Sequence, residues 1–372
     1  MRIGLTSIVF NKQGGISRYV AELAERFVRE HEVHLLTSRY ETRVDGLIVH
    51  RSNILWNPIS LQVVSNALET TLQIKKLREA GIDVVNSQGA EAINSDIVTM
   101  QSCQKAAVRK FSAERGLSYA IMKSVEPRNN IVLAIERYNL KHCKRMIAIS
   151  NSVKDEIIEN YWVPEEKIDV IHSGVNLLEF NPENKKKYRR DIRQKHSLDE
   201  TDTVLMFAGW EFKRKGLQYV IEALPSLSSS IKVLAVGGAD RKPYENLAGK
   251  LGVKGRVVFA GHQRNISEYY AASDIFVFPT AYEPFGLVIT EAMASGVPVV
   301  TTKTAGAAEL ITDGNDGMLL NNPYDSREIS DKVKYILENN LLGSMGLKAR
   351  RTAEKYSWDK VVTDTLAVYE SL

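Results

Sequence analysis

Short apolar runs alternate with longer helical patterns along the 372-residue chain, and this alternation limits the possible folds more than any other feature. In the first half of the chain, runs rich in Val, Ile and Leu lie at 3–9, 33–37, 47–50, 82–86, 97–100, 146–149 and 168–171. In the second half, the runs lie at 204–208, 231–236, 257–260, 275–278, 297–301 and 318–320. Strands that alternate with helices form parallel sheets that helices cover. The sequence therefore predicts an α/β protein with two parallel sheets.

A polar segment at 181–202 separates the two series of runs, and its most charged part is Lys-Lys-Lys-Tyr-Arg-Arg at 185–190. We place the domain boundary close to this segment, with a Rossmann-like domain at 1–175 and a second one at 176–356. In such folds, ligands bind outside the carboxyl ends of the parallel strands. Two of these domains in tandem therefore predict a ligand in a cleft across which the domains face each other.

The overall composition is that of an ordinary globular protein, with 44% apolar and 25% charged residues. No apolar run approaches the roughly 18 residues of a membrane-spanning helix, and the N-terminus lacks a secretory signal pattern. Cys103 and Cys143 are the only cysteines, which are too few for a disulfide framework or a zinc site. We therefore expect a cytoplasmic protein with reduced thiols and no redox chemistry.

Positive charge is concentrated between Lys105 and Arg145, where ten Lys or Arg residues stand against three Glu, although the whole chain has a net charge of only +4. Apolar residues lie between these cations in the pattern of a basic amphipathic helix. Such a helix binds an anionic membrane surface, and 105–145 would then hold the protein peripherally on the inner face of the cell membrane. The alternative is a solvated helix whose apolar stripe packs on its own domain. Nucleic acid is not expected as a partner, because no aromatic-rich binding module or zinc-finger spacing accompanies the charge.

A strand, a loop and a helix are predicted in succession around Glu283 and Glu291. The apolar run that ends at Phe278 is stopped by proline, and a helix is expected from Phe285 to Ser295. The free amides of its first turn and the helix dipole favour a phosphate or polarised hydroxyls, and Gly286 lets a ligand approach closely. Glu283 is suited to accept hydrogen bonds from a sugar, and Glu291 from the paired hydroxyls of a ribose. The alternative is that both are ordinary acids near a helix N-terminus.

In each domain, the turn after the first predicted strand is a further candidate for ligand binding. Gly14 and Gly15 form a flexible turn that allows close approach of a diphosphate, although such pairs are also common in plain turns. The turn lacks the G-x-G-x-x-G spacing of nicotinamide enzymes. In the second domain, Lys213, Arg214 and Lys215 are crowded where a helix is expected to begin, which indicates a bound anion whose natural partners are Arg214 and Lys215. A solvated basic turn is the alternative.

Four segments of the chain resemble those of the retaining family-four glycosyltransferases, whose two-domain arrangement is called GT-B. They are IDVIHSGVNLLEFNP, FAGWEFKRKG, VVFAGHQRNISEYYAASDIFVFP and EPFGLVITEAMASGVPVV. The resemblance covers nearly the whole chain and is strongest in the second half. Within the family, the chain is most similar to the lipopolysaccharide core glucosyltransferases. In this family the last helix, here 357–372, crosses back to the first domain.

The resemblance implies a nucleotide sugar as co-substrate, a glycan or lipid-linked acceptor, and no separate cofactor. It assigns the diphosphate to Gly15, Arg214 and Lys215, and the ribose to Glu291. The remaining donor contacts fall on His262 and Gln263 for the base, and on Glu283 and the amides of Phe285, Gly286, Leu287 and Val288 for the sugar and its phosphate.

The chain departs from the family pattern at Trp210, where many members have Arg, and at Gln101, where many have His. The resemblance implies that this position lies near the reacting sugar, where Gln101 could form hydrogen bonds but could not serve as an acid or base, because it does not titrate. The implied reaction is metal-independent transfer of a hexose with retention of configuration, and no Asp-x-Asp pair is present to bind a divalent ion. The alternatives are a nucleotide-sugar 2-epimerase of the same architecture and a non-catalytic subunit that binds nucleotide or membrane.

Overall fold

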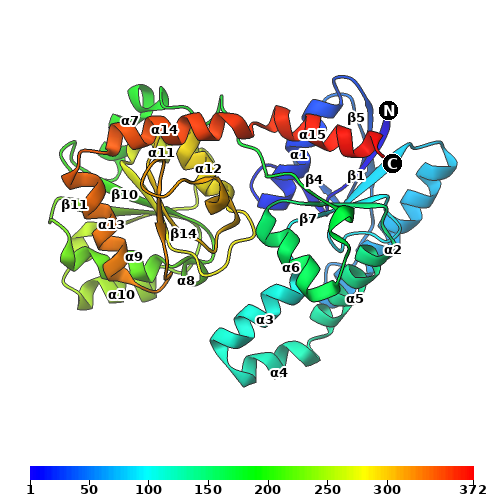
Figure 1. The fold of residues 1–372 in the computed structure, drawn as a ribbon, viewed down its shortest axis with the longest axis horizontal. Helices are drawn as coiled ribbons and strands as arrows, with labels where there is room; N and C mark the ends of the chain where they lie inside the picture. The colour runs from blue at the N-terminus through cyan, green and yellow to red at the C-terminus, as the bar shows by residue number, and fades with distance from the viewer. The chain divides into compact units, whose positions relative to one another are not determined.

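The computed structural model describes all residues from Met1 to Leu372, and the chain divides into two compact units. Unit 1 comprises Met1–Ser173 and Trp358–Leu372, and unit 2 comprises Gly174–Ser357. From the sequence we placed the boundary between 175 and 176. Each unit is built on one main parallel sheet with helices packed on it (Figure 1).

The main sheet of unit 1 has seven parallel strands in the order β5-β3-β1-β6-β7-β8-β9. Its strands are β1 (Arg2–Thr6), β3 (Glu32–Thr37), β5 (Leu47–Arg51), β6 (Val84–Gln88), β7 (Ile97–Met100), β8 (Arg145–Ala148) and β9 (Ile168–Val170). A separate pair consists of β2 (Val9–Phe10) and β4 (Arg39–Tyr40). All seven apolar runs of the first series therefore become strands of one sheet.

The helices of unit 1 follow their strands along the chain, except for the last, which comes from the C-terminus. They are α1 (Gly15–Phe27), α2 (Ile59–Glu79), α3 (Gln104–Arg115), α4 (Leu117–Val125), α5 (Pro127–His142), α6 (Asn151–Tyr161), the 3₁₀ helix Glu165–Lys167 and α15 (Trp358–Glu370). The C-terminal helix α15 packs on α1, where Trp358 makes an edge contact with Tyr19 at 5.5 Å between ring centroids. Tyr369, near the end of α15, accepts a hydrogen bond of 2.8 Å from Asn86 of β6.

The sheet of unit 2 has six parallel strands in the order β12-β11-β10-β13-β14-β15. They are β10 (Thr203–Ala208), β11 (Ile231–Val236), β12 (Val257–Gly261), β13 (Ile275–Phe278), β14 (Val299–Thr302) and β15 (Met318–Leu320). Its helices are α7 (Asn184–Lys195), α8 (Phe212–Lys215), α9 (Leu217–Ala223), α10 (Lys242–Lys250), α11 (Ile266–Ala272), α12 (Leu287–Ala294), α13 (Ser326–Glu338) and α14 (Leu342–Ala353). Four short 3₁₀ helices complete it, at Leu224–Ser226, Lys254–Arg256, Gly306–Leu310 and Glu354–Tyr356.

The central strands of both sheets are buried on both faces, as the continuous apolar runs predicted. Every residue of β13 is buried, and so are all residues of β10 after Thr203. Parallel strands covered by helices on both sides have this pattern, because neither face meets water. The two parallel sheets of the α/β prediction are thus confirmed.

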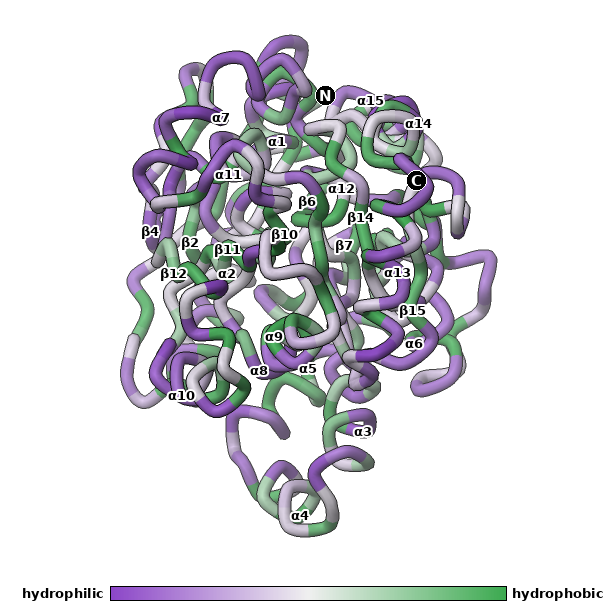
Figure 2. Tube along the Cα trace, turned by 90° about the vertical axis from the view of Figure 1, so that its left-hand side faces the viewer, coloured by the Kyte–Doolittle hydropathy of each residue, from purple (hydrophilic) through white to green (hydrophobic).

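The basic segment at 105–145 is not one amphipathic helix but three, α3, α4 and α5. Gly116 separates α3 from α4 with a φ of 82°, which side chains other than glycine rarely adopt, and Pro127 begins α5. In Figure 1, α3 and α4 project away from the sheet of unit 1. Figure 2 shows apolar residues in α4, at the far end of this projection. None of the helices of the protein is both long and apolar enough to cross a bilayer.

Candidate functional site

The turn after β10 brings two cations to the carboxyl end of the unit 2 sheet. It contains the single helical turn α8 and ends at Gly216, whose left-handed conformation starts α9. A Cβ on Gly216 would lie 2.3 Å from the carbonyl oxygen of Pro279, so glycine allows this turn to approach the end of β13. Arg214 and Lys215 are the last two residues of this single turn, and α9 begins at Leu217 directly after Gly216. The cations therefore lie at the start of the helical segment that follows β10.

The side chains of Arg214, Lys215 and Glu283 meet in what we call the cation–carboxylate cluster. The Glu283 Oε2 atom lies 3.3 Å from the Lys215 Nζ atom and 3.5 Å from the Arg214 Nη1 atom. All three side chains are largely buried, with exposed fractions of 14 to 17%. The Glu283 Oε2 atom forms ion pairs but has no hydrogen-bond partner within the protein. No group of the protein thus satisfies the hydrogen-bonding capacity of this buried oxygen.

Neighbouring groups hold the two cations in position. Glu211, which is mostly exposed, pairs with Arg214 at 2.7 Å, while the Lys215 Nζ atom lies 5.1 Å above the ring of Phe278. The stem of Lys215 crosses Gly209, where a Cβ would lie only 2.4 Å from its Cδ atom. The positive charges of the two cations are thus balanced by the negative charges of two carboxylates, Glu211 and Glu283. An incoming dianion would therefore compete with carboxylates for cations that are already oriented.

The loop between β13 and α12 carries Glu283 and is braced from the following chain segment. Gly306 donates a backbone hydrogen bond of 2.9 Å to the carbonyl of Glu283, and Ala307 donates one of 2.8 Å to the carbonyl of Phe285. The helix α12 begins at Leu287, two residues later than predicted, because Gly286 adopts a left-handed conformation with φ 96°. Phe285 and Gly286 therefore precede the helix. The first-turn amides that face outward along the axis belong to Leu287 and Val288.

Glu291 lies inside α12 and is only 6% exposed. The hydroxyl of Tyr270 on α11 donates a hydrogen bond of 3.2 Å to its Oε2 atom and lies 2.9 Å from the carbonyl oxygen of Val288. Tyr270 thus orients the carboxylate on which the ribose contact was predicted. The sequence analysis missed this residue, because it lies in an ordinary apolar helix pattern and only the packing of α11 on α12 reveals its role.

The residues predicted to frame a base lie just after β12, beside an aromatic residue from the turn after β10. The ring of His262 lies 4.7 Å from that of Trp210, while Gln263 donates to the backbone carbonyl of Ala260. Trp210 is 55% exposed and packs over Gly238, where a Cβ would lie 2.3 Å from the indole ring. Trp210 therefore does not replace the missing arginine with a charge but adds an aromatic surface next to His262.

The remaining predicted residues lie in unit 1. Gly14 precedes α1 in an extended conformation and Gly15 is its first residue, and a Cβ on Gly15 would meet no atom within 4 Å. Neither backbone conformation nor packing within the unit thus demands glycine at Gly15, which leaves room for a ligand. Gln101 follows β7 and donates a hydrogen bond of 3.0 Å from its Nε2 atom to Gln88.

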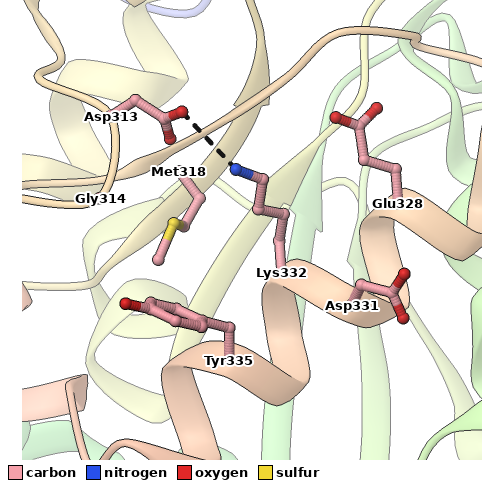
Figure 3. Close-up of a pocket in the computed structure, with 7 residues that line it drawn as sticks. All are labelled: Asp313, Gly314, Met318, Glu328, Asp331, Lys332 and Tyr335. Carbon is pink, nitrogen blue, oxygen red and sulfur yellow. Dashed lines mark ion pairs between the residues drawn. The ribbon is translucent and has the colours of Figure 1, made fainter.

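A cavity of about 400 Å³ in unit 2 contains none of the predicted residues. It is lined by Asp313, Gly314, Met318, Glu328, Asp331, Lys332 and Tyr335 (Figure 3). Lys332 of α13 points toward Asp313, with 3.6 Å between the charged atoms. The oxygens of Glu328 accept hydrogen bonds from the backbone amides of Asn321 and Asn322. The charged groups that line this cavity are thus largely engaged in contacts between α13 and the chain around β15.

Comparison with known proteins gives the same result for both halves of the chain. The family model described as Glycosyltransferase Family 4 matches residues 13–178, and the one described as Glycosyl transferases group 1 matches residues 188–357. An uncharacterized glycosyltransferase of Methanocaldococcus jannaschii is 28% identical over 96% of this chain and 94% of its own length. The lipopolysaccharide glucosyltransferase WaaG of Escherichia coli is 29% identical over 63% of each chain.

Solved structures share the fold across the whole chain. The crystal structure of WaaG superimposes with a TM-score of 0.83 at 22% identity and covers 99% of both chains. A complex of the Anabaena protein Alr3699/HepE with UDP-glucose covers 100% of both chains, with a TM-score of 0.76 and 18% identity. At such identities these two likenesses establish the fold.

Proposed function

Because the chain belongs to the family-four glycosyltransferases of the GT-B type, we propose that it transfers a hexose from a nucleotide diphosphate sugar to a hydroxyl group. The proposed donor is UDP-glucose, and the proposed acceptor is a glycan or glycolipid of cell-surface polysaccharide synthesis. The observation that carries the proposal is the cation–carboxylate cluster, which joins two cations and a carboxylate ahead of α12.

In this proposal, the cation–carboxylate cluster separates the charges of the reaction. Departure of the diphosphate creates negative charge, which Arg214, Lys215 and the first-turn amides of α12 stabilise because they are oriented before the reaction. The sugar becomes oxocarbenium-like. The Glu283 Oε2 atom, which forms ion pairs but no hydrogen bond within the protein, is proposed to accept a hydrogen bond from a hydroxyl of that sugar. These interactions accelerate the reaction only if they strengthen in the transition state.

The transfer is proposed to retain the anomeric configuration without a protein nucleophile, as in the retaining family that the motifs resemble. The leaving phosphate takes the acceptor proton, so no titrating side chain is required at Gln101. The charge on the diphosphate is neutralised by Arg214 and Lys215, and a divalent cation is not part of the proposal.

The choice of donor is supported by the relatives. HepE binds UDP-glucose in a structure of the same fold, and the E. coli relative WaaG is a glucosyltransferase. Glu291, held by Tyr270, is assigned to the ribose, and His262 with Trp210 to the base.

The test is incubation of the purified protein with UDP-glucose, with and without a membrane extract. Release of UDP that depends on the extract supports transfer. Isomerised sugar without any acceptor would instead indicate a nucleotide-sugar 2-epimerase. UDP binding without turnover under both conditions would indicate a non-catalytic subunit.

We also propose that unit 1 meets its acceptor at an anionic membrane through α4. Leu117, Ile121 and Val125 recur every fourth residue on this helix, and their exposed fractions are 76, 55 and 69%. No residue of α4 is buried, so this stripe is not packed on unit 1. The apolar face of an amphipathic helix inserts into a membrane at the boundary between lipid headgroups and acyl chains.

The cations around α4 contribute less than their number suggests. Lys110 and Arg109 of α3 pair with two glutamates of α6, at 3.1 Å from Glu156 and 3.6 Å from Glu159. Lys123 of α4 pairs with Glu126 at 2.5 Å. These contacts leave the apolar stripe as the larger part of the proposed membrane affinity, with electrostatic attraction added.

A further inference from the structure

Unit 1 contains a polar cluster that the proposed mechanism does not use. Thr6 is the last residue of β1, Gln88 is the last residue of β6, Glu91 lies in the loop after β6, and Gln101 follows β7. The strands β1, β6 and β7 are neighbours in the parallel sheet, so these four residues lie close together at its carboxyl end. We call them the unit 1 polar cluster. Ligands of open parallel sheets bind at the carboxyl ends of the strands.

The carboxyl group of Glu91 is held by two donors. The hydroxyl of Thr6 donates a hydrogen bond of 2.8 Å to its Oε2 atom, and the backbone amide of Ile8 donates one of 3.3 Å to its Oε1 atom. Burial raises the pKa of Glu91 to about 7, while these two hydrogen bonds act in the opposite direction. The helices packed beside this loop contribute Asn66, which donates to the Glu91 carbonyl, and Asn139, which donates to the Ala92 carbonyl. Neither ionises, and the pKa of Glu91 is shifted by burial and by its two hydrogen bonds, not by a neighbouring charge.

The amide groups of Gln88 and Gln101 form the other half of the unit 1 polar cluster. The Gln101 Nε2 atom donates to the Gln88 Oε1 atom at 3.0 Å, and the Gln88 backbone amide donates to Thr6 at 3.2 Å. The Gln88 side chain is 2% exposed, and its Nε2 atom has no partner within the protein. A buried donor without an acceptor is costly, so a ligand oxygen at this position would be stabilising.

We propose that the unit 1 polar cluster is a subsite for hydroxyl groups of a neutral sugar in the acceptor, in which Gln88 donates to one hydroxyl and Glu91 accepts from another. This inference rests on the proposed transfer function. Sugar hydroxyls fit because they both donate and accept hydrogen bonds. The cluster contains no cation, so a phosphate is not its ligand, and an apolar ligand would leave Gln88 unsatisfied.

The protonation of Glu91 gives this subsite a distinctive pH response. A carboxylate accepts a hydrogen bond from a hydroxyl more strongly than a neutral carboxyl group does. The folded protein holds the pKa of Glu91 near 7, so the fraction of carboxylate rises from about pH 6 to about pH 8. Sugar affinity should therefore increase with pH across this range.

The test uses the full-length protein saturated with UDP, and saturation-transfer NMR with methyl α-D-glucopyranoside, methyl α-D-galactopyranoside and methyl α-D-mannopyranoside. At least one glycoside should bind, and its affinity should rise several-fold over the pH range. Glu91→Gln should weaken binding by about tenfold at high pH and remove the pH response. Gln88→Met, which preserves shape but removes the amide, should weaken binding by a similar factor at every pH. The exposed Glu41, which accepts a hydrogen bond from Asn11, provides the matched control Glu41→Gln.

UDP affinity separates failure of this inference from failure of the proposed function. If the wild-type protein does not bind UDP, the proposed function fails. If it binds UDP but none of the glycosides, or if Glu91→Gln retains both affinity and pH response, only the subsite is refuted. Should Glu91→Gln fold poorly, Glu91→Asp replaces it and should show weaker binding that still changes with pH. Unchanged binding and an unchanged pH profile in Glu91→Asp and Gln88→Met would also refute the subsite.

Discussion

The cation–carboxylate cluster of unit 2 and the polar cluster of unit 1 both lie at the carboxyl ends of parallel strands, but they are built from different chemistry. In unit 2, Arg214 and Lys215 converge on Glu283, and backbone hydrogen bonds fasten the loop that carries Glu283. In unit 1, the corresponding edge presents two amides and a carboxyl group that is half protonated near neutral pH. Fixed charge suits a diphosphate, which is the same in every donor of its class. Hydrogen-bonding groups that include no cation suit sugar hydroxyls.

The difference shows that one sheet architecture supports two kinds of recognition through the residues at the carboxyl ends of its strands and in the loops that follow. In unit 1 the last residues of β1 and β6, Thr6 and Gln88, belong to the polar cluster, whereas in unit 2 all three residues of the cation–carboxylate cluster follow the strands. The predictions below test whether charge dominates in unit 2 and whether unit 1 contributes exposed apolar surface and open space at its backbone.

Replacement of the cluster lysine is expected to have the largest effect. Lys215→Ala removes an oriented cation from the developing charge and should lower kcat by about 100-fold to 1,000-fold. Lys213→Ala, at an exposed position in the same helical turn, is the matched control and should retain wild-type turnover. Steady-state rates of UDP release measure both. Wild-type turnover by the Lys215 variant would remove this residue from the site.

Glycine at the turn of unit 2 should be required for stability. Gly216→Ala places a Cβ against the Pro279 carbonyl in a conformation with φ 84° and should lower the free energy of unfolding by about 1 to 3 kcal/mol. Gly249→Ala, inside α10 with no atom near its added Cβ, should be neutral or stabilising. Urea denaturation of both variants gives the comparison, and equal stabilities would contradict the steric argument.

The apolar stripe of α4 should account for membrane affinity. Replacing Leu117, Ile121 and Val125 together by Ser should weaken binding to phosphatidylethanolamine and phosphatidylglycerol vesicles by about tenfold or more. The control Leu178→Ser changes an even more exposed leucine in unit 2 and should leave binding unchanged. Co-sedimentation at low and high salt measures the electrostatic part, since the Debye length falls from about 10 Å at 0.1 M to about 3 Å at 1 M. Absence of wild-type binding at low salt would end this proposal.

Replacement of Gly15 should affect donor binding and not stability, in contrast to replacement of Gly216. Gly15→Ala meets no protein atom and begins a helix, so its thermal stability should equal or exceed that of the wild type. If a donor diphosphate approaches this backbone, the added methyl group should raise the KM for UDP-glucose by about tenfold. Thermal unfolding and steady-state kinetics on one preparation separate the two effects. An unchanged KM would remove Gly15 from the donor site.

Chelation should have the smallest effect. Arg214 and Lys215 supply the positive charge in the proposed mechanism, so the rate of UDP release in EDTA should stay within about twofold of the untreated rate. Complete loss of activity that magnesium restores would show that a divalent ion is part of the reaction.

The two parallel sheets could be predicted from the sequence, because each of the thirteen apolar runs contributes a strand to one of them. The sequence also pointed to Arg214, Lys215 and Glu283, since each follows a strand at the edge where ligands of parallel sheets bind. Such features are local: a run of Val and Ile or a strand followed by a glycine turn is visible without knowing the rest of the fold.

Which groups touch depends on the packing of the folded chain. The close approach of Gly216 to Pro279, which divides the helical segment after β10 into α8 and α9, is not visible in the sequence. The pairing of Tyr270 with Glu291 and the contact of Thr6 with Glu91 join segments that are distant in sequence. Burial of Glu91, which raises its pKa, likewise depends on how helices cover the sheet. Desolvation and hydrogen bonding are properties of packing, and a linear pattern does not record them.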